Sequence, residues 1–275
     1  MQQLEPRAFQ IGLILSDTPW VRREIVRLAS GIWSDLESWA PTGSTFEAGH
    51  LNAAQPVSGW RFRRLDWQTL QERVSEDVEF IEVRTVVTEP PRTIDEVRAF
   101  KIPVRLSVHF AAGYVRVIGH AFPTMHNPPE SREQMSGALE ARLLAIAEAT
   151  DALLTGFITV DYVVPDSFPY EVAVLLNPYR TDWSRWIPGY YWGNFLSRGH
   201  LAEVDIAEAA EKAGMVVERG SGWLWVRLPE TYPRCDRSAL HELRAILSPV
   251  VPDGSMTVEE YFAQGPPYIV HDLCL

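Results

Sequence analysis

Three histidines in the middle of the chain are the first candidates for a metal site. His109, His120 and His126 are followed closely by Glu130 and Glu133, and imidazole and carboxylate groups are common zinc ligands. His109 and His120 belong to a predicted hairpin whose turn lies beside His109, which places the two imidazoles about 20 Å apart and excludes a shared ion. His120 and His126 can still approach each other. Whether these two form part of a site stays open, and we assign no metal and no cofactor.

Other catalytic signatures are incomplete. His241-Glu242 begins like the helix of a zinc protease, but Ala245 stands where the second histidine ligand is required. Gly220-Ser-Gly222 lies between two predicted strands, whereas a dinucleotide-binding loop must open a helix. The chain also has no G-x-S-x-G elbow and no Walker loop. The sequence therefore predicts a protein that is not an enzyme.

The charge composition restricts the class of partner that the protein can bind. With 36 acidic and 25 basic residues the formal charge is -11 at pH 7, which argues against nucleic acid and favours a basic protein partner. The first apolar run, Ile11–Leu15, is too short for a signal-peptide core or a membrane span, so we expect a cytoplasmic protein that does not contact the membrane. The two cysteines, Cys235 and Cys274, are expected to be reduced thiols.

Tryptophans are the most unusual feature of the C-terminal part. Trp223 and Trp225 share one face of a predicted strand, and Leu224, Val226 and Leu228 share the other. If the aliphatic face is the core, both indoles face outward and can anchor a protein partner; the alternative is that a neighbouring helix or lobe covers them. The residues that we predict to bind a partner are Trp183, Trp186, Trp223 and Trp225.

The elements that position these residues can be read from hydrophobic spacing. A buried strand is predicted at residues 9–15, followed by a helix that begins near Pro19 and ends before Pro41, and then by a loop over residues 41–59. Period-two patterns predict strands at 78–85, 102–108 and 114–120. Ser131-x-x-Gln134 has the form of a capping box for a helix that ends near Thr150, and residues 156–164 return to strand character.

The C-terminal part has its own set of elements. We predict an extended segment over 189–196, a helix from about Gly199 to Ala213, a hairpin over 215–228 and a helix capped by Asp236. The whole order is typical of an α+β fold with mainly antiparallel sheets covered by helices. We expect two lobes, residues 1–165 and 166–275, the second entered through the aromatic-rich segment.

The segment Pro188–Ser197 and the elements after it resemble the C-terminal part of bacterial immunity proteins that neutralise toxins of polymorphic or type VI secretion systems. Trp192, Asn194 and Leu196 carry the resemblance in a W-x-N-x-L arrangement. It implies a non-enzymatic cytosolic protein that binds one cognate toxin. From the residues themselves, we expect Trp192 and Leu196 to pack between strand and helix, and Asn194 to satisfy the backbone at a turn.

Two hypotheses follow. The first is an immunity protein that binds and neutralises a cognate toxin by direct association. The alternative is an enzyme, or a protein that binds a small molecule or metal between the lobes through His120, His126 and an acidic residue.

Overall fold

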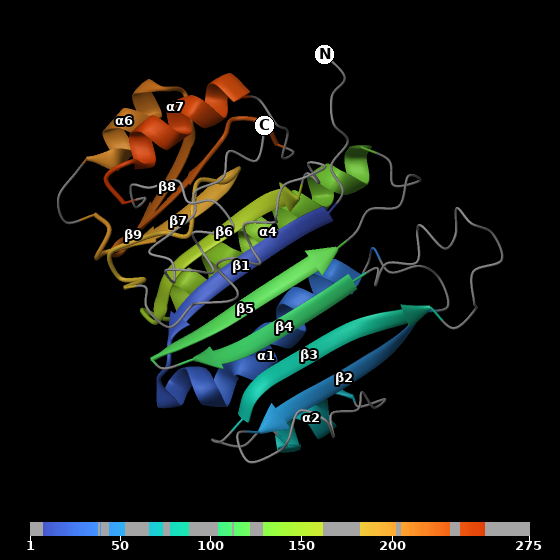
Figure 1. Cartoon of the computed structure of the whole chain (residues 1–275). Coiled ribbons are helices and arrows are strands. Elements are labelled where there is room, and N and C mark those ends of the chain that lie inside the picture. The colour runs from blue at the N-terminus through green and yellow to red at the C-terminus, as the bar shows by residue number, and fades with distance from the viewer. Residues whose placement is uncertain are drawn as a thin grey trace, which may run out of the picture.

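A single antiparallel sheet organises the molecule. The computed structural model describes residues 8–37, 39, 44–52, 66–73, 78–87, 104–111, 113–121, 129–161, 182–201, 205–231 and 237–250. Within these ranges, nine strands form one sheet in the order β2-β3-β4-β5-β1-β6-β7-β9-β8 (Figure 1), and every neighbouring pair is antiparallel. The expectation of an α+β fold with an antiparallel sheet is confirmed.

The bounds of the elements are as follows. The strands are β1 (Ala8–Ser16), β2 (Ser44–Asn52), β3 (Val78–Val87), β4 (Val104–Ala111), β5 (Tyr114–Ala121), β6 (Leu153–Asp161), β7 (Gly193–Ser197), β8 (Val216–Gly220) and β9 (Trp223–Arg227). The helices in the same ranges are α1 (Pro19–Glu37), α2 (Trp67–Arg73), α4 (Pro129–Ala149), α6 (Ile206–Lys212) and α7 (Arg237–Leu247).

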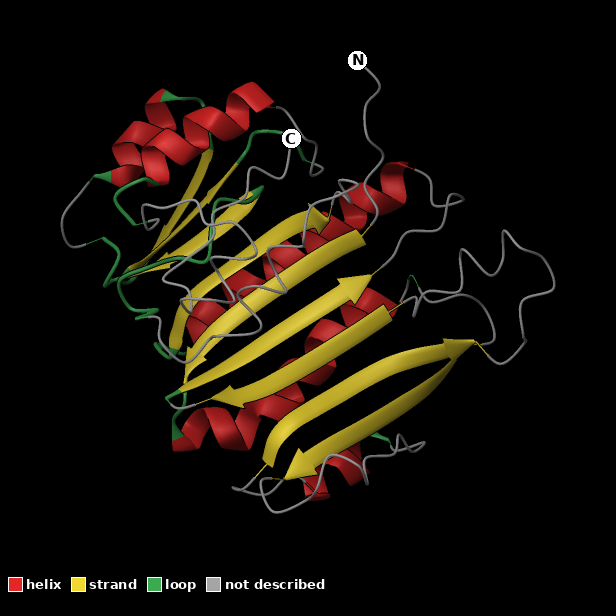
Figure 2. Cartoon of the chain, viewed as in Figure 1, coloured by secondary structure: helices red, strands yellow, loops and turns green. Residues whose placement is uncertain are grey.

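Helices α1 and α4 cover one face of the sheet and lie behind it in Figure 2. Helix α1 contacts β4 and β5, while α4 contacts β1 and β6. Gly119 permits the close approach of α1, because a Cβ at this position would lie 2.7 Å from the Leu36 Cδ1 atom. The core of the molecule is therefore the layer between these two helices and the residues of β1, β4, β5 and β6 that face them.

Helix α1 forms where the sequence predicts it. Thr18 caps it by accepting a hydrogen bond from the Val21 N–H at 3.2 Å, and Pro19 takes the first helical position, where no backbone N–H is required. Its buried stripe is made of Val21, Ile25, Val26, Leu28, Ala29, Ile32, Trp33 and Leu36.

The last three strands of the sheet are covered on both faces. Trp225 faces α4, because its indole N–H donates to the Glu140 Oε1 atom at 2.6 Å. The opposite face belongs to α6, since Arg219 forms an ion pair with Glu211 of α6 at 2.6 Å. Side chains alternate between the two faces of β8 and β9, so those on one face point toward α4 and those on the other toward α6. A helix therefore lies on each face of this part of the sheet.

Four elements differ from the sequence prediction, and one of them, helix α2 (Trp67–Arg73), had no counterpart in it. Residues 44–52, expected within a loop, form edge strand β2, which pairs with β3 from Ser44 to Asn52. Helix α4 begins at Pro129, so Ser131 lies inside the helix and not at its start. Helix α6 begins at Ile206 with Asp205 as its cap, whereas the prediction began it near Gly199. At Gly199 a Cβ would lie 2.1 Å from the Ser184 carbonyl oxygen, so this glycine serves a close backbone approach.

The predicted boundary between residues 165 and 166 falls between β6 and β7. These two strands pair directly, with Thr155 opposite Leu196 and Ile158 opposite Gly193. One sheet therefore runs through both predicted lobes. Independent folding of the two parts stays a prediction.

Candidate functional site

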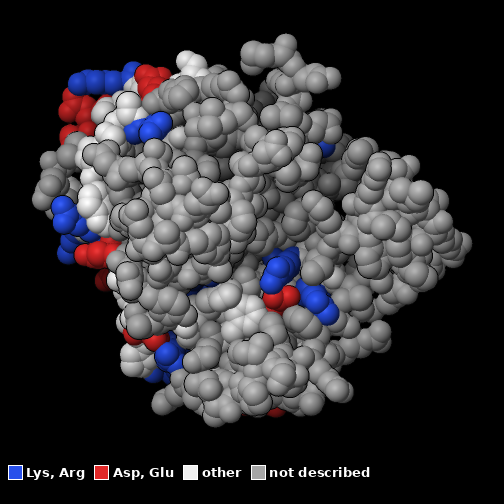
Figure 3. Space-filling view, viewed as in Figure 1, with Lys and Arg blue, Asp and Glu red and all other residues white. Residues whose placement is uncertain are grey.

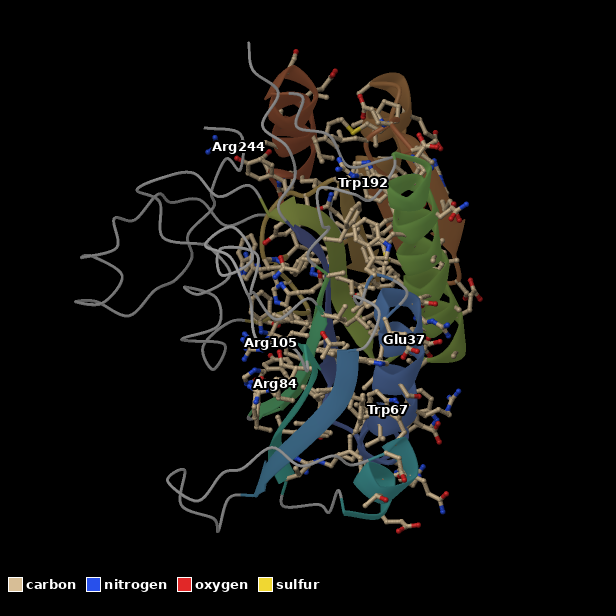
Figure 4. All side chains as sticks on the ribbon, turned by 90° about the vertical axis from the view of Figure 1, so that its right-hand side faces the viewer. Glu37, Trp67, Arg84, Arg105, Trp192 and Arg244 are labelled. Carbon is tan, nitrogen blue, oxygen red and sulfur yellow. The ribbon has the colours of Figure 1, made fainter. Side chains whose placement is uncertain are left out.

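Polar side chains line the face of the sheet that is turned away from α1 and α4, here called the polar face. Five of them occupy consecutive register positions across β3, β4, β5, β1 and β6, and we call this set the polar row: Arg84, Arg105, His120, Gln10 and Thr159. In the edge-on view of Figure 4, the labelled Arg84 and Arg105 project from the side of the sheet opposite to Glu37 of α1. On the face shown in Figure 3, basic side chains gather beside an acidic one near its middle.

The polar row runs from a solvent-facing part into the interior. The Arg105 side chain is 45% exposed and forms an ion pair with Glu82, whose side chain is 5% exposed. His120 is half-buried, and Gln10 and Thr159 are buried. Because neighbouring strands are about 4.8 Å apart, Arg105, His120 and Gln10 lie within about 10 Å of one another.

Gln10 is the exceptional member of the row. It is fully buried, and neither its side-chain oxygen nor its nitrogen has a hydrogen-bond partner in the part of the chain that the structure describes. A buried amide without partners is unfavourable by about 1–3 kcal/mol. Its position in the middle of a polar row therefore requires an explanation.

The two histidines of the polar face are uncharged at neutral pH. Burial, and then the charges of Arg116 and Arg105, lower the pKa of His109 to about 3. Burial, and then the charge of Arg105, lower the pKa of His120 to about 4. Each imidazole therefore offers one N–H donor and one acceptor nitrogen near pH 7.

The observed register corrects the predicted histidine separation. His120 pairs with Arg105 and His109 pairs with Arg116, so the two histidines are four residues apart along the strands, about 14 Å. The distance is shorter than predicted and still excludes one shared ion. Within the described ranges, no three His, Cys, Asp or Glu side chains gather closely enough to hold a metal ion. His126, Cys235 and Cys274 lie outside these ranges.

Two of the four tryptophans that were predicted to bind a partner have little exposed surface. Trp225 is fully buried, because α4 covers the face of β9 that was expected to be free, and Trp183 is 2% exposed. Trp223 and Trp186 are half-buried and keep some surface. These two remain candidates for partner contact.

Glu140 explains why Trp225 is inside. The Glu140 Oε1 atom accepts hydrogen bonds from the Trp225 indole at 2.6 Å and from Arg227 Nε at 2.7 Å. The Arg227 guanidinium also lies 5.3 Å from the centre of the Trp192 ring. This cluster of Glu140, Trp225, Arg227 and Trp192, here called the Glu140 cluster, joins α4 to the C-terminal strands and is structural.

All three W-x-N-x-L residues are buried. The Asn194 side-chain oxygen accepts from the Tyr191 N–H at 2.9 Å, and its NH₂ group donates to the Tyr191 carbonyl at 2.7 Å. The Trp192 indole donates to the Glu230 carbonyl at 3.0 Å. These contacts satisfy backbone groups within the chain, so in this structure the motif organises the entry to β7 and offers no surface.

The glycine turn and His241 are the remaining residues that the sequence analysis singled out. Gly220 and Gly222 flank the turn between β8 and β9, and Gly222 adopts a φ of 88°, which favours glycine. His241 belongs to α7, but its side chain lies outside the described residues.

Sequence reasoning missed the polar row as a unit. The period-two pattern does place Arg105 and His109 on one strand face, and it shows Gln10 as the polar residue inside an apolar run. That pattern is the available signal. The pattern does not give the order of the strands in the sheet. Strand β1 lies between β5 and β6, and both of these strands are far from it in the sequence.

Comparisons with known proteins give a fold and no family. No family model matches the chain, and no curated protein matches it. Among solved structures, the chain is similar to the Pseudomonas aeruginosa T6SS protein PA0821, with a TM-score of 0.58 and 14% sequence identity. The match covers 98% of this chain and 80% of that one. In the described part of the chain, none of the helices combines the length and the apolar character needed to cross a bilayer.

Proposed function

We propose that this protein is an immunity protein of a type VI secretion system, which binds and neutralises a cognate toxin by direct association. The observation that carries the proposal is the structural likeness to a T6SS protein over 98% of the chain. A second, separate support is the sequence resemblance to immunity proteins, which rests on the residues Trp192, Asn194 and Leu196.

The charge of the chain supports a basic partner. A net charge of -11 creates a field that accelerates encounter with a positively charged protein and slows encounter with a negatively charged one. Such steering acts mainly on the association rate and weakens as salt is added. The proposed partner is therefore a basic toxin whose association rate falls with ionic strength.

Two half-buried tryptophans are suited to anchor the contact. The Trp223 ring packs 5.7 Å from the Phe195 ring, and the Trp186 ring lies 4.7 Å from the Arg185 guanidinium. Rings that are already held by neighbours lose little conformational freedom when a partner covers them, which is the property of an interface anchor.

The proposed mode of action is occlusion without catalysis. The three histidines with resolved shifts have lowered pKa values, because burial disfavours the charged imidazole in His109, His120 and His200. A general base works best with a pKa near the operating pH, and values of about 3 and 4 for two of these histidines are far below it.

Co-expression with the toxin encoded beside its gene tests the function. We expect restored growth in a strain that expresses this toxin, and a complex of the two purified proteins that elutes together in size-exclusion chromatography. An adjacent gene that encodes no toxin, or growth arrest that persists when both proteins are expressed, would contradict the proposal.

Matched tryptophan variants test the surface. Trp223→Ala and Trp186→Ala are expected to weaken the complex by tenfold or more, since truncating an aromatic anchor costs about 2 kcal/mol or more. Trp67→Ala is the control, because Trp67 is also half-buried but packs on Phe46 of β2, at the other end of the sheet. Equal weakening by all three variants would argue against an interface at Trp223 or Trp186.

A further inference from the structure

Strand β8 is one edge of the sheet, and among the described residues no strand pairs with its outer side. A two-residue turn joins β8 to β9, so Gly220 and Trp223 form the closing, hydrogen-bonded pair of this hairpin. Because hydrogen-bonded and non-hydrogen-bonded pairs alternate along an antiparallel ladder, the backbone N–H and C=O groups of Val217 and Arg219 point away from β9. The edge therefore presents backbone donors and acceptors to a further strand.

The pairing of β8 is regular up to its end, unlike that of the other edge strand. The register of β2 with β3 shifts between Leu51 and Asn52, and an irregularity of this kind hinders pairing with another strand. The register of β8 with β9 is continuous from Val216 to Gly220, and β8 contains no proline. Strand β8 is thus suited to the binding mode in which an extended peptide joins the edge of a sheet.

An acidic side chain on β8 selects the kind of segment that fits. Glu218 is exposed and has no ion-pair partner within the described ranges. The exposed acids of the neighbouring helix α6 are already paired, Glu208 with Lys212 and Glu211 with Arg219. Opposite charges at facing positions of neighbouring strands are favourable. An added strand should therefore place Lys or Arg opposite Glu218, which agrees with the basic partner that the net charge of -11 favours.

A second copy of the chain fits this edge less well than a basic segment. If two β8 strands pair antiparallel around a twofold axis, the register centred on Glu218 places two carboxylates opposite each other, and the register centred on Arg219 places two guanidinium groups opposite each other. Like charges at such positions are destabilising. The register centred on Val217 leaves Glu218 opposite Val216, without a counter-charge. None of these registers supplies the cation that Glu218 lacks.

The Trp223 indole extends the same surface. It lies against Gly220, where a Cβ would overlap the ring, so β8 leaves room for the indole beside its outer edge. Trp223 and Gly220 are register partners, and Glu218 lies two positions along β8 on the same face. Side chains of an added strand that point to this face would therefore cover the ring and meet the carboxylate.

We propose that an extended, basic segment of the toxin adds to β8 as a further strand of the sheet. The backbone of the segment pairs with Val217 and Arg219, a Lys or Arg side chain pairs with Glu218, and a neighbouring side chain covers Trp223. This inference rests on the proposed function, since the toxin is the partner, and it adds the mode of binding.

Amide hydrogen exchange, resolved by NMR, detects the added strand directly. In the free protein, the Val217 and Arg219 amides should exchange faster than the Glu218 amide, which points toward β9 and is the internal control. Addition of the toxin encoded beside the gene should slow exchange at residues 217 and 219 by about tenfold or more, since an amide held in a ladder exchanges when the strand opens.

Arg219→Pro and Arg219→Ala form a matched pair of variants. Both remove the ion pair with Glu211, but proline also removes the outward N–H, a position at which edge strands tolerate it. Calorimetric titration with the toxin should give an affinity that is lower for Arg219→Pro than for Arg219→Ala by about fivefold, the value of one backbone hydrogen bond. Far-ultraviolet circular dichroism verifies that both variants are folded.

Glu218→Gln tests the charge contact, with Glu72→Gln as the control. Glu72 is exposed on α2, a helix that packs on β2 at the opposite edge, and each variant reduces the net negative charge by one. Glu218→Gln should weaken the complex about threefold or more, the value of an exposed ion pair, and Glu72→Gln by less than about twofold. Equal effects of the two variants would refute the contact with Glu218.

The outcomes separate the added strand from the proposed function. If the unaltered protein neutralises the toxin, but exchange at Val217 and Arg219 is unchanged or Arg219→Pro binds as tightly as Arg219→Ala, the toxin contacts another surface and the added strand is refuted, whereas the function is not. If the unaltered protein does not bind the toxin, both proposals fail. Slow exchange of both amides in the free protein, together with elution as a dimer, would assign the edge to a second copy and overturn the inference.

Discussion

Replacing Glu140 by alanine tests how the C-terminal strands are held to the rest of the molecule. The Glu140 side chain is 14% exposed and the Arg227 side chain is 15% exposed. Alanine removes the carboxylate that accepts from both Trp225 and Arg227. The variant therefore leaves a largely buried guanidinium without its counter-charge and a buried indole N–H without its acceptor.

The expected loss of stability follows from these two groups. Removing one partner of a buried ion pair costs about 3–5 kcal/mol. Arg227 keeps a hydrogen bond to the Leu228 carbonyl at 3.0 Å and its contact with the Trp192 ring, which places Glu140→Ala at the lower end, about 3 kcal/mol. Glu140→Gln retains an acceptor oxygen and should cost less, about 1–2 kcal/mol.

Urea unfolding, followed by tryptophan fluorescence and by far-ultraviolet circular dichroism, measures both size and cooperativity. The matched control is Glu148→Ala, since Glu148 lies exposed on the same helix, and its effect should stay within about 0.5 kcal/mol. Because one sheet runs through residues 1–165 and 166–275, we expect the two signals to give one coincident transition.

Two outcomes would refute this reasoning. Equal stability of Glu140→Ala and Glu148→Ala would show that the Glu140 cluster holds nothing together. A biphasic transition, in which Glu140→Ala shifts one phase alone, would show that the two predicted lobes unfold separately despite the shared sheet.

Three further predictions concern the sheet and can be measured by the same urea unfolding. Asn194→Ala should lower the free energy of unfolding by about 2–4 kcal/mol, since it leaves a buried backbone N–H and C=O without partners; a change below about 0.5 kcal/mol would contradict it. Gly12→Ala should also destabilise, because the new Cβ would lie 2.3 Å from the Phe157 ring; a fully stable variant would refute this contact. Acid should destabilise the fold through His109 and His120, whose folded pKa values of about 3 and 4 lie below the unfolded value of 6.5. The unfolded chain therefore binds more protons than the folded one as the pH falls from 6.5 to 4. The free energy of unfolding should decrease over this interval by roughly 1 kcal/mol per pH unit for each histidine. The variant with both histidines replaced by glutamine should lose less stability over that interval, and an unchanged pH dependence would contradict the assignment.

Hydrophobic spacing was sufficient to predict strands that pair with the next strand in the sequence. In strands β4 and β5 polar and apolar residues alternate with a clear period of two. Gly113 lies in the turn between these strands and adopts a φ of 86°, a conformation that favours glycine. Strand β2 gave no such signal, because most of its residues are small or polar and because it lies at the edge of the sheet, where β3 is its one strand partner among the described residues. Its strand character depends on its partner and could not be seen in residues 44–52 alone.

Burial of Trp225 could not be predicted for a different reason. The alternation of β9 correctly separates Trp223 and Trp225 from Leu224, but alternation cannot show whether a second layer covers the tryptophan face. That layer is α4, which meets Trp225 through Glu140, 85 residues away in the sequence. Covering a strand on both faces is a tertiary property, and it converts an expected interface residue into a core residue.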